Sequence, residues 1–374
     1  MADIHSFGVD PVSCHAFNKD RSQVAVALNG NDVAIYAKDQ VGWKASPIQT
    51  LTKHDLRVTS IDWAPKSNRI VTCSADRNGY VWNWDGKTWE PVLVHLRINR
   101  AATYVRWSPR ENKFAVGSGA KLVSVCYIDD ANNWWLSKHI KKPLQSTVSC
   151  LDWHPNNVLL ATGSTDFRTR VFSAYIKEIE DKPEPTPWGA RMPLGQLMAE
   201  FPSGGWVHGV SFSPDGNRVA WVSHDSSIAV ASAGGDKVAS LSLSGLPLLK
   251  CLWLSPLKVV AAGYDCCPLL FEVNDNALTF VTSLDKQKKT EAGGNVSAMR
   301  KFRDMDKLSL DSGTAGPDIG TVMTTIHQNT ISSVTVHSNQ GDKVSKFATS
   351  GVDSKLIVWD VKALEASLGS VRLH

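Results

Sequence analysis

Histidine and aspartate recur as a pair at two places in the chain, and these are residue types found in hydrolytic sites. His54 precedes Asp76 and His327 precedes Asp353, each pair with Ser or Thr residues nearby in the sequence. In nucleophilic catalysis an Asp orients a His, which takes a proton from a hydroxyl group. An Asp in a tight turn, however, is commonly satisfied by backbone and His donors. We therefore interpret both pairs as structural.

No other pattern for catalysis or cofactor binding accompanies these pairs. The sequence lacks a phosphate-binding Gly loop, a metal-ligand spacing and a nucleophile elbow. His139, His208 and His224 are scattered singly, and the adjacent Cys266 and Cys267 are poorly placed for a chelate or a disulfide. We predict a protein that is not an enzyme and needs no cofactor or metal.

A repeat along nearly the whole chain predicts the elements that position these residues. An aromatic residue, often followed by a small residue or His and then Pro, introduces each copy, as in Trp63-Ala64-Pro65. A turn Asp stands 13 positions later at Asp76, Asp166 and Asp225, and 12 positions later at Asp265. A second aromatic residue stands 6 positions after the turn Asp at Trp82, Phe172, Phe271 and Trp359. Repeats of about forty residues are typical of stacked sheet units.

The number of copies predicts an all-β, seven-bladed propeller forming a single domain over residues 1–374. The first strands are anchored at Phe17, Trp63, Trp107, Trp153, Phe212, Trp253 and Val336. Each copy supplies three strands of period two, and an outer strand before the next copy completes a four-stranded blade. The last copy has no following strand, so we expect residues 4–9 to complete blade seven. Residues 362–368 are predicted to form a short helix after this closure.

The copies resemble the WD-repeat family, whose Trp-Asp ending stands here as Trp359-Asp360. In that family a His, the turn Asp, a Ser or Thr and the closing Trp form a hydrogen-bonded set. The resemblance implies this structural role for His54, Asp76 and Trp82, for His327, Asp353 and Trp359, and at the equivalent turns for Asp166, Asp225 and Asp265.

Two intervals between anchors are longer than the rest. Trp153 and Phe212 are 59 positions apart, and the excess contains several prolines. Residues 177–200 are therefore predicted to form an extended, solvent-side connection between blades four and five. Trp253 and Val336 are 83 positions apart. This interval predicts a projecting insertion at 285–325 between blades six and seven, longer than ordinary loops.

Within the second insertion, apolar residues recur at steps of three. Val296, Met299, Phe302 and Met305 follow this spacing, while basic residues such as Arg303 occupy the other face. The pattern predicts a short amphipathic helix near 296–308, which is too short to be stable without a partner. The apolar face either packs back on the propeller or binds another protein, and the spacing leaves both alternatives open.

Composition narrows the classes of function. The 374 residues include 14 Trp and 43% hydrophobic residues, enough for a large core, and the net charge is only +4. We therefore expect no nucleic-acid binding and no membrane insertion. The N-terminus lacks the features of a secretory signal. The seven Cys show no paired spacing, and four of them fall in strand-like segments, which indicates reduced thiols and a cytoplasmic location.

Basic residues gather in the predicted loops of blades three and four. They are Arg97, Arg100, Arg106, Lys138, Lys141 and Lys142. Composition alone favours an ordinary solvated surface. The alternative is a surface that binds an acidic peptide through charge-assisted hydrogen bonds.

Several stretches resemble subunit 1 of the actin-related protein 2/3 complex, and the resemblance spans the chain and both insertions. They are residues 96–103, 138–143, 172–178, 185–189, 205–210 and 218–225. The resemblance implies a non-catalytic scaffold in a seven-subunit cytoplasmic assembly, associated with cortical actin, that nucleates branched actin filaments. It also implies that Met299, Phe302, Arg303 and Met305 contact the mother filament. Finally, it implies that the basic loops help to bind the acidic tail of nucleation-promoting factors.

Two other functions compete with this interpretation. A generic WD-repeat adaptor, such as a substrate receptor of a ubiquitin ligase, would use the same fold. A propeller hydrolase would need site chemistry that the sequence lacks.

Overall fold

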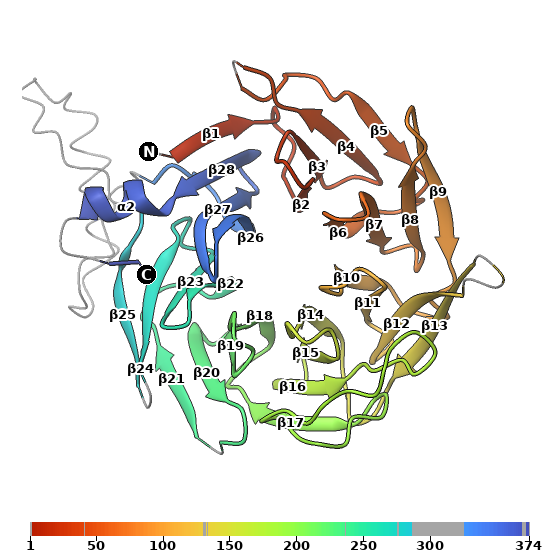
Figure 1. The fold of residues 1–374 in the computed structure, drawn as a ribbon. Helices are drawn as coiled ribbons and strands as arrows, with labels where there is room; N and C mark the ends of the chain where they lie inside the picture. Colours follow the sequence, from red (N-terminus) through yellow and green to blue (C-terminus); the bar gives the residue numbers. More distant parts are fainter. Residues whose placement is uncertain are drawn as a thin grey trace, which may run out of the picture.

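Seven sheets, each of four antiparallel strands, stand like blades around a central channel (Figure 1). The computed structural model describes residues 2–40, 42–129, 132, 134–235, 237–274, 277–285, 325–368 and 372–373. Within these residues the chain is almost entirely β, with one short helix near its C-terminal end. The predicted all-β, seven-bladed propeller is confirmed.

Each blade consists of consecutive strands, numbered from the channel outwards. Blade one contains β2 (Cys14–Phe17), β3 (Gln23–Ala27), β4 (Asp32–Ala37) and β5 (Gln49–Thr52), and blade two contains β6 (Val58–Ala64), β7 (Arg69–Ser74), β8 (Gly79–Trp84) and β9 (Trp89–Val94). Blade three contains β10 (Ala102–Trp107), β11 (Lys113–Ser118), β12 (Leu122–Asp129) and β13 (Trp134–Ile140), and blade four contains β14 (Val148–Trp153), β15 (Leu159–Ser164), β16 (Arg168–Ser173) and β17 (Leu197–Pro202). Blade five contains β18 (Val207–Phe212), β19 (Arg218–Ser223), β20 (Ser227–Ser232) and β21 (Val238–Ser242), and blade six contains β22 (Leu248–Ser255), β23 (Lys258–Gly263), β24 (Leu269–Asn274) and β25 (Ala277–Ser283).

Blade seven joins the two ends of the chain. Its inner strands are β26 (Ile331–Gln340), β27 (Lys343–Gly351) and β28 (Lys355–Asp360), and its outer strand is β1 (Ala2–Ser6). The register pairs Ala2 with Trp359 and Ser6 with Lys355. The closing strand thus begins two residues earlier than the predicted 4–9, and residues 7–9 already belong to the loop towards blade one. The predicted helix at 362–368 is present as α2 (Val361–Leu368).

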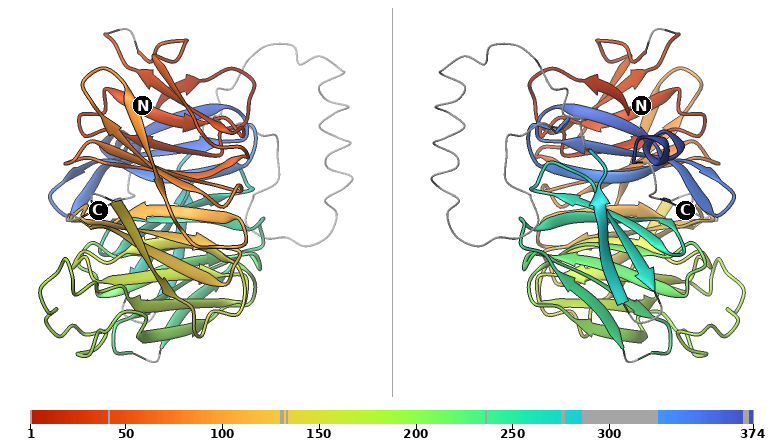
Figure 2. Two further views of the ribbon diagram at one scale, coloured as in Figure 1. Left: turned by 90° about the vertical axis from the view of Figure 1, so that its right-hand side faces the viewer. Right: turned by 90° about the vertical axis from the view of Figure 1, so that its left-hand side faces the viewer.

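Since neighbouring strands are antiparallel, the connections alternate between the two faces of the ring. We call the top face the one formed by loops from an outer strand to the next blade and by turns between second and third strands. The bottom face carries the turns between first and second strands and the connections between third and fourth strands. Figure 2 shows the ring edge-on, with the long connection in yellow-green on the bottom face.

The hydrophobic core lies between neighbouring blades. Apolar side chains of alternate strand positions interlock there, as expected from the period of two. Trp63 of β6 packs edge-on against Trp89 of β9 at 5.4 Å between ring centroids, and Phe201 stacks on Trp221 of the next blade at 5.5 Å. Such aromatic pairs add directional contacts to the burial of apolar area.

The connection predicted at 177–200 is placed differently by the structure. It joins β16 to β17 within blade four rather than blade four to blade five, because the outer strand of that blade follows the Pro-rich segment. Residues 197–200 belong to β17. The segment is also not confined to solvent, since Trp188 and Met192 are buried in the core cluster of blades four and five. The insertion at 285–325, with its predicted helix, lies largely outside the described residues, which end at 285 and resume at 325.

Candidate protein-interaction surfaces

The His–Asp pairs form closed hydrogen-bonded sets inside blades two and seven. His54 Nδ1 lies 2.9 Å from Asp76 Oδ2, and its Nε2 lies 2.8 Å from Thr72 Oγ1, which accepts a bond from Trp82 Nε1 at 3.0 Å. His327, Asp353, Thr349 and Trp359 repeat this arrangement. Burial lowers the pKa of His54, in spite of the opposing effect of Asp76. The neutral ring satisfies every member of the set.

These sets place a hydroxyl group beside a His and an Asp, as a hydrolase would, but the hydroxyl is out of reach. Thr72 and Thr349 are completely buried in the second strands of their blades. Their oxygen atoms are occupied by the Trp and His side chains. No substrate can approach such a nucleophile, so the geometry serves to fix the strands and the turn.

The other turn aspartates make different hydrogen bonds, but they too stabilise their turns. Asp166 binds Arg170 Nη1 at 3.0 and 2.8 Å, Asp225 accepts bonds from Ser223 and Ser227, and Asp265 accepts a bond from Leu246 N. Each Asp lies in the turn between the second and third strands. All of them stabilise loops of the top face.

The structure gathers part of the predicted basic surface into one pocket on the top face. Arg97, Lys141 and Lys142 line a cavity of about 610 Å³, formed by the loops before and after blade three and by the top-face turn of that blade. Lys121 lines it as well, and no carboxylate does. Arg100 lies beside the turn that leads to Lys121, because a Cβ at Gly119 would come within 3.3 Å of its Cβ. Four cationic side chains with no carboxylate among the lining residues favour an anionic ligand, although the Arg97 guanidinium also donates to Ser137 O and Oγ.

Two of the predicted basic residues lie elsewhere. Arg106 is in the wall of the central channel, where Nη1 lies 3.4 Å from Asp62 Oδ1. Lys138 stands on the outer strand β13 and pairs with Glu178 at 2.7 Å. Lys121, in contrast, was missed by the sequence analysis. Its position directly after the second strand of blade three could have indicated a top-face turn.

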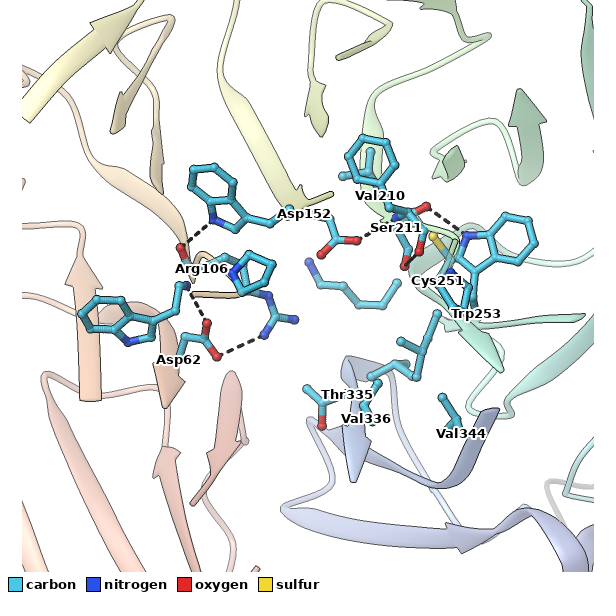
Figure 3. Close-up of a pocket in the computed structure, with 18 of the residues that line it drawn as sticks. Asp62, Arg106, Asp152, Val210, Ser211, Cys251, Trp253, Thr335, Val336 and Val344 are labelled. Atoms are coloured by element: carbon cyan, nitrogen blue, oxygen red, sulfur yellow. Dashed lines mark hydrogen bonds and ion pairs between the residues drawn. The ribbon is translucent and has the colours of Figure 1, made fainter. Parts of the chain in front are cut away.

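The central channel contains a cavity of about 650 Å³, shown in Figure 3. Its side chains tie neighbouring blades together. Asp62 accepts a bond from Trp107 N, and Asp152 accepts one from Phe212 N, both at 2.7 Å. Lys250 of blade six reaches across to the ring of Tyr104 in blade three, with Nζ 4.5 Å from the ring centroid. Polar contacts across the channel thus hold the blades together.

The carboxylates of the channel are not arranged as an acid–base pair. Burial raises the pKa of Asp62, and it raises the pKa of Asp152 to about 6, with Phe212 N and Arg106 opposing the shift. Each carboxylate is already held by a backbone N–H group of the next blade. Among the described residues no group of three or more His, Cys, Asp or Glu side chains could hold a metal ion. In that same part of the chain, no helix has the length and apolar character needed to cross a membrane.

The residues predicted to contact a filament, Met299, Phe302, Arg303 and Met305, lie outside the described residues. The segments that flank them are held on the top face. Ile326 N donates to Asp285, and Lys355 Nζ donates to Ile326 O. His327 then enters the hydrogen-bonded set of blade seven.

Comparison with known proteins agrees with this architecture. The family described as "WD domain, G-beta repeat" matches residues 45–83 and 136–173. These segments cover the outer strand of blade one with most of blade two, and the equivalent part of blades three and four.

Several curated proteins are similar over nearly the whole chain. "Actin-related protein 2/3 complex subunit 1A-A" of Xenopus laevis is 52% identical, covering 99% of both chains. "Actin-related protein 2/3 complex subunit 1" of Schizosaccharomyces pombe is 45% identical over 92% of this chain and 95% of its own length. "Actin-related protein 2/3 complex subunit 1B" of Arabidopsis thaliana is 41% identical over 99% of both.

Proposed function

The chain belongs to the family of subunit 1 of the actin-related protein 2/3 complex, and we propose that it acts there as a non-catalytic scaffold for the nucleation and branching of actin filaments. The observation that carries this proposal is the similarity over almost the full length to relatives from frog, yeast and plant that bear this name. Its first partners are then the other subunits of the complex. The location that follows is the cytoplasm, at cortical actin structures.

Purification of the native assembly tests this role. The actin-related proteins and the other subunits of the complex should co-purify with this chain in equal amounts. Recovery of cullin adaptors instead would support a ubiquitin-ligase receptor and contradict the scaffold role.

The insertion is proposed to contact the mother filament through Met299, Phe302, Arg303 and Met305. Its spacing gives one apolar stripe, and its flanking segments are anchored to the top face by Asp285 and Lys355. A segment anchored at both ends can carry a short recognition helix, which gains stability when its apolar face is covered by a partner.

Replacing Phe302 and Met305 together by Ala should weaken binding of the complex to filament sides by about tenfold or more, because buried apolar anchors dominate such contacts. Cosedimentation with filaments and branch density measure this effect. The melting temperature should stay nearly unchanged. The control variant replaces Arg300 and Lys301 of the opposite face by Ala. A large loss of melting temperature would mean that the apolar face packs on its own propeller.

The basic pocket is proposed to bind the acidic tail of nucleation-promoting factors. The residues we assign are Arg97, Arg100, Lys121, Lys141 and Lys142, which the pocket geometry and the adjacent turn bring together. Arg and Lys groups on an exposed surface attract carboxylates most strongly at low ionic strength.

Reversal of charge at Lys141→Glu and Lys142→Glu should reduce the affinity for the acidic tail by about tenfold at low salt, and by less at high salt. Fluorescence anisotropy with a labelled tail peptide measures the affinity. Lys138→Glu is the matched control, because Lys138 stands on the outer strand β13, away from the pocket, where it pairs with Glu178. Equal effects of the two changes would remove the pocket from the proposal.

A further inference from the structure

One strand organises three of the four cations that line the basic pocket. β13 continues directly into the loop that carries Lys141 and Lys142. Its last residue pairs with the second residue of β12, immediately after the turn that carries Lys121. The fourth cation, Arg97, comes from a separate segment, the loop between β9 and β10. The pocket therefore depends on contacts that fix this loop relative to β13.

Two side chains of β13 supply such contacts. Ser137 Oγ donates to His95 O at 2.8 Å, and His139 Nε2 donates to Leu96 O at 2.9 Å. Because alternate side chains of a strand point to the same face, both of these residues reach the same loop. The loop is thus held at two successive carbonyl groups, directly before Arg97.

Arg97 is held by its side chain as well. Its Nε donates to Ser137 Oγ at 3.2 Å, and its Nη2 donates to Ser137 O. Both bonds use one edge of the guanidinium group, and no described residue accepts a bond from Nη1. The backbone of Arg97 has a φ of 54°, in the left-handed region, which a residue other than glycine keeps when its surroundings hold it there. The other edge of the guanidinium group is left to bind a ligand.

The hydroxyl group of Ser137 uses both of its hydrogen-bonding functions in this arrangement. It accepts a bond from Arg97 Nε and donates its hydrogen to His95 O, so its orientation is determined. Ser137 is only 6% exposed, and a ligand in the pocket would meet Arg97 rather than this hydroxyl group. Ser137 can therefore influence binding only through the residues that it holds.

We propose that Ser137 is a positioning residue of the basic pocket, which orients Arg97 towards an acidic peptide before that peptide binds. The inference rests on the proposed binding of the acidic tail to this pocket. An Arg side chain that is already ordered loses little rotamer freedom when a ligand arrives, and its planar group matches the geometry of a carboxylate. Removal of the hydroxyl group should weaken tail binding although no charge is removed.

A double-variant cycle tests whether Ser137 acts through Arg97. The complex is reconstituted with Ser137→Ala, with Arg97→Ala, with both changes or with neither, and the probe is a fluorescent peptide of the acidic tail. Ser137→Ala should lower the affinity by about three- to tenfold at low salt, and it should have no further effect once Arg97 is Ala. Additive losses would overturn the proposal, and so would an unchanged affinity of Ser137→Ala.

Ser124→Ala is the matched control. Ser124 is completely buried, and its Oγ donates to Leu96 O at 3.0 Å. This change therefore removes a serine hydrogen bond to the same loop but leaves the bonds of Arg97 intact. The affinity for the tail peptide should stay near that of the unchanged complex. A loss equal to that of Ser137→Ala would assign the effect to the loop as a whole and would contradict a role through Arg97.

The same measurements separate this inference from the proposed tail site. If Arg97→Ala and the charge reversal at Lys141 and Lys142 weaken binding but Ser137→Ala does not, the tail site stands and the positioning role fails. If none of these changes alters the affinity, the tail site itself is contradicted.

Discussion

Replacement of Lys113 by Met is expected to destabilise the propeller by about 3–5 kcal/mol, because it leaves a buried carboxylate without its cation. Lys113 begins β11, and its side chain is completely buried. Its Nζ donates to Ala174 O at 2.8 Å and to the carboxylate of Glu180, and it lies 5.3 Å from the ring of Trp153. Glu180 also accepts bonds from Asn157 Nδ2 and from Ile176 N at 3.1 Å.

A double-variant cycle separates the pair from its surroundings. Glu180→Gln alone should also be strongly destabilising, since it leaves the buried ammonium group of Lys113 without its carboxylate partner. Lys113→Met combined with Glu180→Gln should recover most of the loss, because replacing both partners of a buried pair is often nearly neutral. Urea unfolding of the four proteins measures the free energies. Additive losses in the double variant would show that the two side chains stabilise the fold independently.

The pH dependence gives an independent check on the same pair. Burial lowers the pKa of Lys113 from 10.5 to about 8, despite the opposing effect of Glu180. Between these two values the unfolded chain holds the proton and the folded chain does not. The contribution of this group to stability therefore rises as the pH increases from about 8 to 10.5. This rise should be absent from Lys113→Met.

This ion pair also illustrates why the sequence predicted the blades but not the side-chain contacts between segments that lie far apart in the chain. The blades follow from local offsets, since each turn Asp and closing aromatic residue recur at fixed distances from an anchor. Lys113 and Glu180 are 67 positions apart, and Glu180 lies in a Pro-rich segment without periodicity. Composition made that segment look like a solvent-side crossing. Trp188 and Met192, which are buried in the structure, could have indicated otherwise, since large apolar residues in a connection usually pack into a core.

The basic surface was predicted only in part for a similar reason. Clustering in sequence ignores whether a residue lies in a loop or on one side of a strand. Arg106 belongs to β10, and strand alternation turns it towards the channel and Asp62. Lys141 and Lys142 follow a strand and reach the top face, where Lys121 joins them from the turn between β11 and β12. Sorting the basic residues by the face of their loops would have separated these groups.

Removal of residues 1–9 is expected to lower the free energy of unfolding by about 3–5 kcal/mol. β1 pairs with β28 over five residue positions, and each net backbone hydrogen bond contributes about 0.5–1.5 kcal/mol. Its side chains add less, since Ile4 is half exposed. Lys38 would also lose its 2.8 Å contact with Asp3. Urea unfolding of the full and shortened chains measures the loss.

Addition of the missing segment as a separate peptide decides whether the loss comes from strand pairing. A peptide of residues 1–9 should restore stability in proportion to its concentration, because an exposed sheet edge accepts an added strand through main-chain hydrogen bonds. The same peptide with His5→Pro should not, since the register that begins with Phe7 N donating to Ser354 O turns the N–H of His5 towards β28, and proline cannot donate to the ladder. Equal rescue by both peptides would contradict closure by strand pairing.

Since β28 carries Trp359 of the hydrogen-bonded set, an open edge there should loosen His327 and Asp353 before the other blades unfold. Hydrogen exchange in the shortened chain should therefore rise first in blade seven.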